Sequence, residues 1–119
     1  HDMNPVRAWW RENRQTTQHY YNNVMQWWGE APYDASAEIC REIINRHLAS
    51  PAMLTILPLQ DWMSIDGNLR FSDPEAERIN VPANPTHYWR YRMHLTLEQL
   101  LAADDFNNEV SYLISANYR

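Results

Sequence analysis

The chain has 119 residues, which suits one small domain, and 45% of them are hydrophobic, including six Trp and seven Tyr. That apolar and aromatic content excludes an intrinsically disordered segment. Fifteen acidic residues against ten Arg and no Lys give a net charge of −5, so no basic face is expected for nucleic acid or for an anionic membrane surface.

Two helical segments are predicted in the first third of the chain. Asp2 and Asn4 are N-cap residue types and Pro5 suits a first helical turn, so a helix is expected over residues 6–10. A second helix is expected over residues 15–28, where apolar side chains follow helical spacing. Its apolar face comprises Tyr20, Val24, Trp27 and Trp28, and Gly29 with Pro32 is expected to end it.

The clearest helix is predicted to begin after Asp34 or Ser36 and to end near Leu48, before Ser50-Pro51. Its apolar residues form one stripe. Cys40, the single cysteine, lies on this stripe and can form no internal disulfide, so we expect a buried thiol in a reducing, cytoplasmic setting. The stripe consists of Ile39, Cys40, Ile43, Ile44, His47 and Leu48.

Residues 52–57 (AMLTIL) form a continuous apolar run before Pro58. Their length and composition predict a fully buried strand of a parallel sheet, and the run is far shorter than the ~20 residues that cross a bilayer. Such a strand needs neighbours that the rest of the sequence does not contain. The expected fold class is therefore mainly α with one short buried strand, incomplete as an isolated chain.

The last third alternates irregular and helical segments. A short helix or turn is expected over residues 59–65, followed by a long polar stretch, 70–92, whose length favours a functional loop. Thr96 with Gln99 predicts a capping box that opens a helix through Leu101. A last helix is expected from Asp104, with Val110, Leu113 and Ile114 facing the core.

Two pairs of residues are candidates for chemistry. In His1-Asp2, the aspartate is either a helix cap or a functional carboxylate. Gln60 and Asp61 follow the apolar run directly, and either face an active-site mouth or form a turn that bonds its own backbone. The histidines lack metal-ligand spacing, and a copper site on His1 belongs to a β-sandwich fold, so no metal or cofactor is expected.

The long polar stretch supplies a third group. Arg78 and Asn80 offer donors for sugar hydroxyls or for holding a catalytic carboxylate. Trp89 has an aromatic face that can stack on a sugar or pack against the protein. Arg90 and Arg92 favour a structural role, in which ion pairs with carboxylates hold the loop in place.

Taken together, these segments resemble the C-terminal part of the 4-α-glucanotransferases, the amylomaltase or disproportionating enzyme family. The opening His1-Asp2-Met3, with Arg7 and the Trp9-Trp10 pair, is similar to the family's His-Asp motif and the helix after it. Residues 50–61 resemble its last-strand motif, and residues 77–82 and 89–92 resemble its closing signature. Ala83 and residues 84–88 look more like the branch that contains the plant cytosolic disproportionating enzyme.

The resemblance implies that residues 1–119 are the C-terminal segment of a (β/α)₈ catalytic barrel. The family transfers α-1,4-glucan segments between maltodextrins by a retaining double displacement, and its nucleophile and acid/base lie upstream, so the isolated chain is expected to be inactive. Asp2 matches the carboxylate that stabilises the transition state. The substrate-binding matches are His1, Gln60, Asp61 and Asn80, and the supporting matches are Arg78, Trp89, Arg90 and Arg92.

Two other interpretations remain open. The chain can be a non-enzymatic carbohydrate-binding or interaction module that uses surface Trp residues, or part of a hydrolase of the same clan. The expected partners are an α-glucan substrate and the upstream part of the same polypeptide. Without that part, helices that should cover a barrel would expose an apolar face, so the isolated chain is expected to dimerise or to swap elements.

Overall fold

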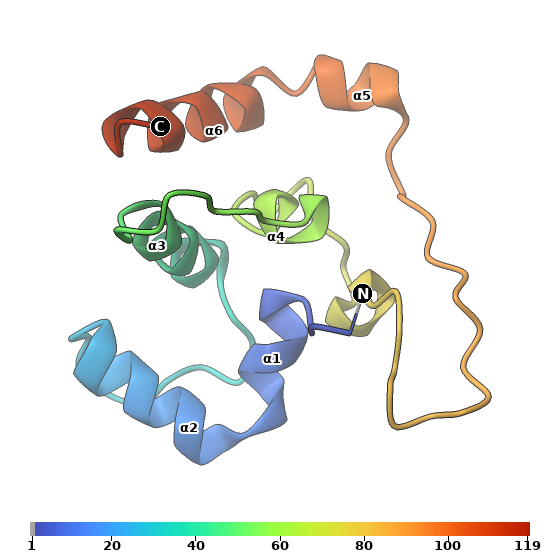
Figure 1. Cartoon of the computed structure of the whole chain (residues 1–119), viewed down its shortest axis with the longest axis horizontal. Helices are drawn as coiled ribbons and strands as arrows, with labels where there is room; N and C mark the ends of the chain where they lie inside the picture. Colours follow the sequence, from blue (N-terminus) through green and yellow to red (C-terminus); the bar gives the residue numbers. More distant parts are fainter. Residues whose placement is uncertain (1) are drawn as a thin grey trace.

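The computed structural model describes residues 2–119, and every regular element in that range is a helix (Figure 1). His1 lies outside the described residues. Irregular segments connect the helices, and the longest of them lies between η2 and α5. The elements are α1 (Val6–Glu12), α2 (Arg14–His19), the π-helix η1 (Tyr20–Val24), α3 (Ala37–Leu48), α4 (Leu59–Met63), the 3₁₀ helix η2 (Pro74–Glu77), α5 (Leu97–Leu101) and α6 (Asp104–Ala116).

Helix α3 is shared by two hydrophobic clusters. Its first half packs against α1 and the segment after η1, and its second half packs against α4 and α6. Trp10 is the largest side chain buried in the first cluster, and it meets Trp9 and Tyr21 edge to face. Its indole Nε1 donates to the Pro32 carbonyl at 2.9 Å, which satisfies the one polar atom that its burial would otherwise strand.

Helix α3 forms as the sequence predicts. The hydroxyl of Ser36 caps it by accepting a hydrogen bond from the Ile39 amide at 3.2 Å. Cys40 is fully buried, and that burial raises the pKa of its thiol above the ordinary value. His47 departs from the prediction because its ring lies on the exposed side of the helix. The capping box of Thr96 and Gln99 before α5 is also confirmed.

The helix expected over residues 15–28 ends earlier than predicted. After α2 the backbone widens into the π-helix η1, in which the Met25 amide donates to the Tyr20 carbonyl at 2.9 Å. Gln26 then takes a left-handed conformation with φ 60°, which stops the helix before Trp28. Trp28 is 95% exposed as a result, and its expected place on an apolar face is wrong.

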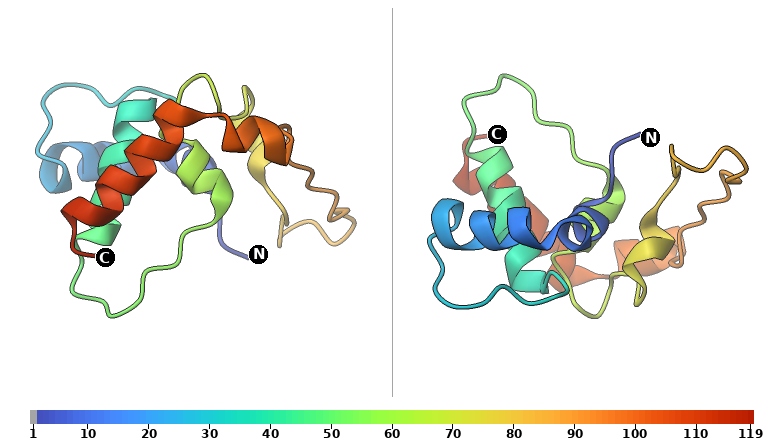
Figure 2. Two further views of the ribbon diagram at one scale, coloured as in Figure 1. Left: turned by 90° about the horizontal axis from the view of Figure 1, so that it is seen from above. Right: turned by 90° about the horizontal axis from the view of Figure 1, so that it is seen from below.

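The expected buried strand is absent, because no strand occurs anywhere in residues 2–119. Residues 52–57 form an irregular segment that arches out between α3 and α4 (Figure 2). Met53, Leu54 and Ile56 are 92%, 78% and 88% exposed. The prediction of a short buried strand within a (β/α)₈ barrel portion is therefore wrong for this chain.

The physical reason is that a strand satisfies its backbone groups through a neighbouring strand, and the described residues provide none. The carbonyl of Ala52, and two carbonyls just before the segment, bind a side chain instead. The guanidinium of Arg119 donates to the carbonyls of Leu48, Ser50 and Ala52 at 2.7, 2.9 and 2.7 Å. An apolar composition favours a strand only where a neighbouring strand is present to pair with it.

Candidate functional site

The N-terminal segment runs alongside the residues that follow η2. The amide Nδ2 of Asn80 donates to Asp2 Oδ1 at 2.9 Å, and Arg78 donates to Asn4 Oδ1 at 2.5 Å. The side chain of Asp2 is exposed. The structure thus brings together two residues that the sequence proposed separately, Asp2 and Asn80, although 78 positions separate them.

Asp2 does not cap a helix. The N-cap position of α1 is Pro5, which provides no side-chain hydrogen bond. The cap comes from another helix, because the Val6 amide donates to Asp61 Oδ1 at 2.9 Å. Asp61 therefore acts at the positive end of α1, a site that favours a carboxylate. Burial raises the pKa of Asp61, and the Val6 amide partly opposes that rise.

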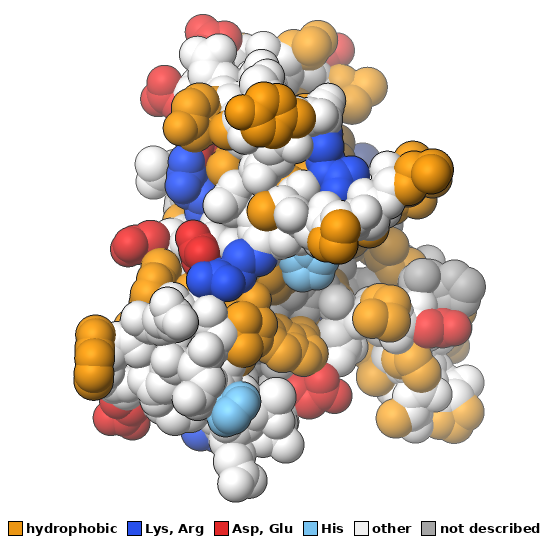
Figure 3. Space-filling model, turned by 60° about the vertical axis from the view of Figure 1, so that its left-hand side comes forward, with side chains coloured by type: hydrophobic (Ala, Val, Ile, Leu, Met, Phe, Trp, Pro, Cys, Tyr) orange, Lys and Arg blue, Asp and Glu red, His pale blue; other side chains and the backbone are white. Residues whose placement is uncertain are grey.

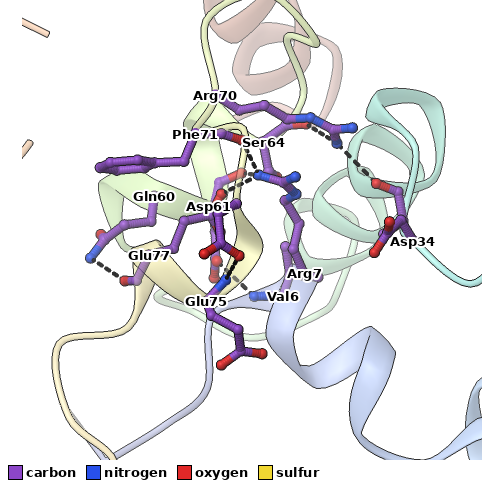
Figure 4. Close-up of polar contacts among 12 residues, drawn as sticks. Val6, Arg7, Asp34, Gln60, Asp61, Ser64, Arg70, Phe71, Glu75 and Glu77 are labelled. Carbon is purple, nitrogen blue, oxygen red and sulfur yellow. Dashed lines mark hydrogen bonds and ion pairs between the residues drawn. The ribbon is translucent and has the colours of Figure 1, made fainter. Parts of the chain in front are cut away.

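A buried ion pair, Arg7–Glu77, joins the same two parts of the chain. Nη1 of Arg7 contacts Glu77 Oε1 at 2.6 Å, and the two side chains are only 5% and 1% exposed (Figure 4). The same nitrogen donates to the Phe71 carbonyl at 2.7 Å. Burial raises the pKa of Glu77, while the hydrogen bond from Arg7 opposes the rise. The pair joins α1 to η2 and to the segment that precedes η2.

The remaining predicted residues divide by location. Gln60 is buried in α4, and its Nε2 lies 3.4 Å from the backbone carbonyl of Glu77, so it contacts the main chain of η2. Trp89, Arg90 and Arg92 are exposed on the extended segment that passes around the outside of the molecule (Figure 1). The guanidinium of Arg90 lies over the Tyr88 ring, 4.6 Å from its centroid.

Sequence reasoning missed the roles of Arg7 and Glu77. One signal was available, because Arg7 stands among apolar residues at the start of α1, and a buried guanidinium requires an acidic partner. Fifteen acidic residues compete for that role in the sequence. Nothing in the spacing selects Glu77, which is 70 positions away.

Comparison with known proteins defines the family of the chain. A family model described as 4-alpha-glucanotransferase matches residues 1–97. The chain therefore belongs to the 4-alpha-glucanotransferase family, and the resemblance drawn from its motifs is confirmed.

Two curated relatives carry the same description. The chain is 34% identical over its whole length to the 4-alpha-glucanotransferase DPE2 of Oryza sativa subsp. japonica. It is 25% identical over 97 residues, 78% of the chain, to the chloroplastic/amyloplastic 4-alpha-glucanotransferase of Solanum tuberosum. It spans only 13% and 14% of these two relatives. No solved structure matches the chain significantly.

Proposed function

We propose that the chain is a segment of a longer 4-α-glucanotransferase that transfers α-1,4-glucan segments between maltodextrins. The main support is the exposed carboxylate of Asp2 in a chain of this family. Its Oδ1 accepts a hydrogen bond from Asn80 Nδ2 at 2.9 Å. Asp2 is assigned to stabilise the transition state. His1, which precedes it in the motif, is assigned to bind the same sugar. The lone buried Cys40 suits a reducing compartment such as the cytoplasm.

The proposed reaction is a retaining double displacement. Such enzymes use a nucleophile and an acid/base whose carboxyl groups lie about 5–5.5 Å apart. We assign both groups to another part of the longer polypeptide. Asp2 would accept hydrogen bonds from hydroxyls of the distorted sugar, and these bonds strengthen as the transition state forms. Because Asn80 donates to Oδ1, this hydrogen bond contributes to the orientation of the carboxylate before the sugar arrives.

The neighbouring residues support this assignment unequally. Asn80 is half-buried and touches Asp2 directly, so it combines orientation of the carboxylate with sugar binding. Asp61 commits Oδ1 to the Val6 amide, which leaves Oδ2 as the atom for a sugar hydroxyl. Gln60 is buried, so its contribution passes through Glu77. Trp89 is the exposed aromatic candidate for stacking on a glucose ring.

The exposed apolar residues support a larger assembly. Hydrophobic side chains stand out on the surface (Figure 3), and Met53, Leu54 and Ile56 are exposed close together on one irregular segment. Figure 2 shows that this segment and the N-terminal segment extend to the same side of the molecule. A partner that covered residues 53–56 would therefore lie on the same side of the molecule as the N-terminal segment. We assign that partner to the upstream part of the same polypeptide, and in its absence to a second copy of the chain.

Maltotriose distinguishes the candidate functions. The longer polypeptide should convert it to glucose and a ladder of longer maltodextrins, and the isolated chain should produce neither. Glucose and maltose without elongation would instead indicate hydrolysis. Exposed Trp28 favours the second candidate, a carbohydrate-binding module. That function would show as retardation of the isolated chain in a glycogen-containing gel with no turnover by the longer polypeptide.

A further inference from the structure

We propose that the buried pair Arg7–Glu77 is a positioning device for the Asp2 carboxylate. This inference rests on the proposed role of Asp2 and adds two residues that do not themselves touch the substrate. It starts from the way the first residues of the chain are bound. Between Asp2 and Arg7, four successive contacts attach the segment to η2, to the residues after it and to α4.

Three of these contacts join two segments that run antiparallel to each other. We call these three contacts the N-terminal clamp. They pair Asp2 with Asn80, Asn4 with Arg78, and Arg7 with Glu77, at 2.9, 2.5 and 2.6 Å. The residues advance along one segment as they go back along the other. A shift at the Arg7–Glu77 end therefore moves every later contact, including the one that holds Asp2.

Burial decreases steadily along the clamp. Arg7 and Glu77 are buried, Asn4 and Arg78 are half-buried, and Asp2 is exposed. A hydrogen bond on the surface competes with water and cannot by itself fix an exposed carboxylate. The buried end lies in a medium of lower dielectric constant, where the same charges interact more strongly. The buried Arg7–Glu77 contact consequently sets the distance between the N-terminal segment and the residues after η2, and this distance determines where Asp2 lies.

The choice of an ion pair also favours a positioning role. Apolar residues of similar volume often stabilise a core as well as a buried ion pair does, so stability alone does not explain the pair. Arg7 uses one nitrogen for both Glu77 and the Phe71 carbonyl, which fixes α1 against two segments at once. Apolar packing lacks this directionality. A misplacement of ~1 Å at a catalytic group is enough to cost ~100-fold in rate.

The test compares steady-state kinetics of the longer polypeptide on maltotriose. The double substitution Arg7→Met with Glu77→Leu removes the charges and keeps the bulk. It should lower kcat about 10- to 100-fold, as a displaced catalytic group does, with little change in KM, because the lost interaction acts in the transition state. Glu77→Gln retains an acceptor for Arg7 and should recover most of the activity.

Two further comparisons isolate the positioning role. In an Asp2→Asn background the Arg7→Met/Glu77→Leu pair should cause no further loss of kcat, because both changes act through one carboxylate. The matched control is Arg46→Met with Glu42→Leu, an ion pair at 2.9 Å on the outer side of α3, which should leave kcat unchanged.

The outcomes separate this inference from the proposed function. If Asp2→Asn is inactive but Arg7→Met/Glu77→Leu keeps kcat within twofold of wild type, the positioning role is overturned and the proposed function stands. If Asp2→Asn itself remains active, the proposed function fails. If the double variant loses its near-ultraviolet circular dichroism, the test is repeated with Asn4→Ala. This variant removes the Asn4–Arg78 contact of the clamp and leaves the buried pair intact. A several-fold loss of kcat would support the inference, and an unchanged kcat would overturn it.

Discussion

Removal of the Glu77 carboxylate should destabilise the chain far more than removal of any exposed acid. In Glu77→Ala, the Arg7 guanidinium stays buried, loses its carboxylate partner and keeps its bond to the Phe71 carbonyl. Breaking a buried pair from one side costs about 3–5 kcal/mol, because the remaining charge is uncompensated. Since small domains are stable by about 5–15 kcal/mol, this loss amounts to about a fifth of the unfolding free energy or more.

Urea unfolding followed by Trp fluorescence measures this change, because buried Trp10 reports on the same core. The control is Glu75→Ala, which breaks the more exposed pair with Arg78 and should cost at most about 1 kcal/mol. Replacing both buried charges, as Arg7→Met with Glu77→Leu, should restore much of the stability lost in Glu77→Ala. A cost below about 1 kcal/mol for Glu77→Ala would refute the reasoning that the pair is desolvated.

Three further outcomes follow from burial. Trp10→Ala should cost about 3–5 kcal/mol in urea unfolding, whereas Trp28→Ala should change stability by no more than about 0.5 kcal/mol; equal costs would contradict the two side chains' burial. Burial raises the pKa of the Asp61 carboxyl in the folded state. The protonated carboxyl therefore contributes to the free energy of unfolding below the ordinary Asp pKa, and this contribution is lost as the pH rises through the raised pKa of the folded state. Asp61→Asn still accepts from the Val6 amide and should flatten that fall, so an unchanged pH profile would contradict the burial effect. Light scattering should show dimers of the isolated chain that Ile56→Glu abolishes, and a monomeric wild type at high concentration would count against an exposed association surface.

Local signals in the sequence predicted most of the helices. The Ser36 cap and the box of Thr96 with Gln99 each act across three residues, and the apolar stripe that contains Cys40 repeats every three or four residues, so all three signals are visible in the local sequence. The end of the second helix was misplaced because the π-helix at Tyr20 and the left-handed Gln26 leave no comparable mark.

The failures share a dependence on distant partners. The apolar run 52–57 was predicted to be a buried strand, but strand formation is decided by a neighbour that residues 2–119 do not supply. In the site, too, the contacts between distant residues were not predicted. The motif alone suggested Asp2 and Asn80, but neither their direct contact nor the pairing of Arg7 with Glu77 follows from spacing, since each joins residues at least 70 positions apart.

The central claim is that Asp2 is a catalytic carboxylate of a glucan-transferring enzyme, and its amide variant tests that claim most directly. In the longer polypeptide, Asp2→Asn should lower kcat for the disproportionation of maltotriose by several orders of magnitude and leave the unfolding midpoint unchanged, because the side chain is exposed. Asp105→Asn, an exposed change on α6, serves as the control and should retain full activity. Near-normal turnover by Asp2→Asn would remove Asp2 from the catalytic set and contradict the account.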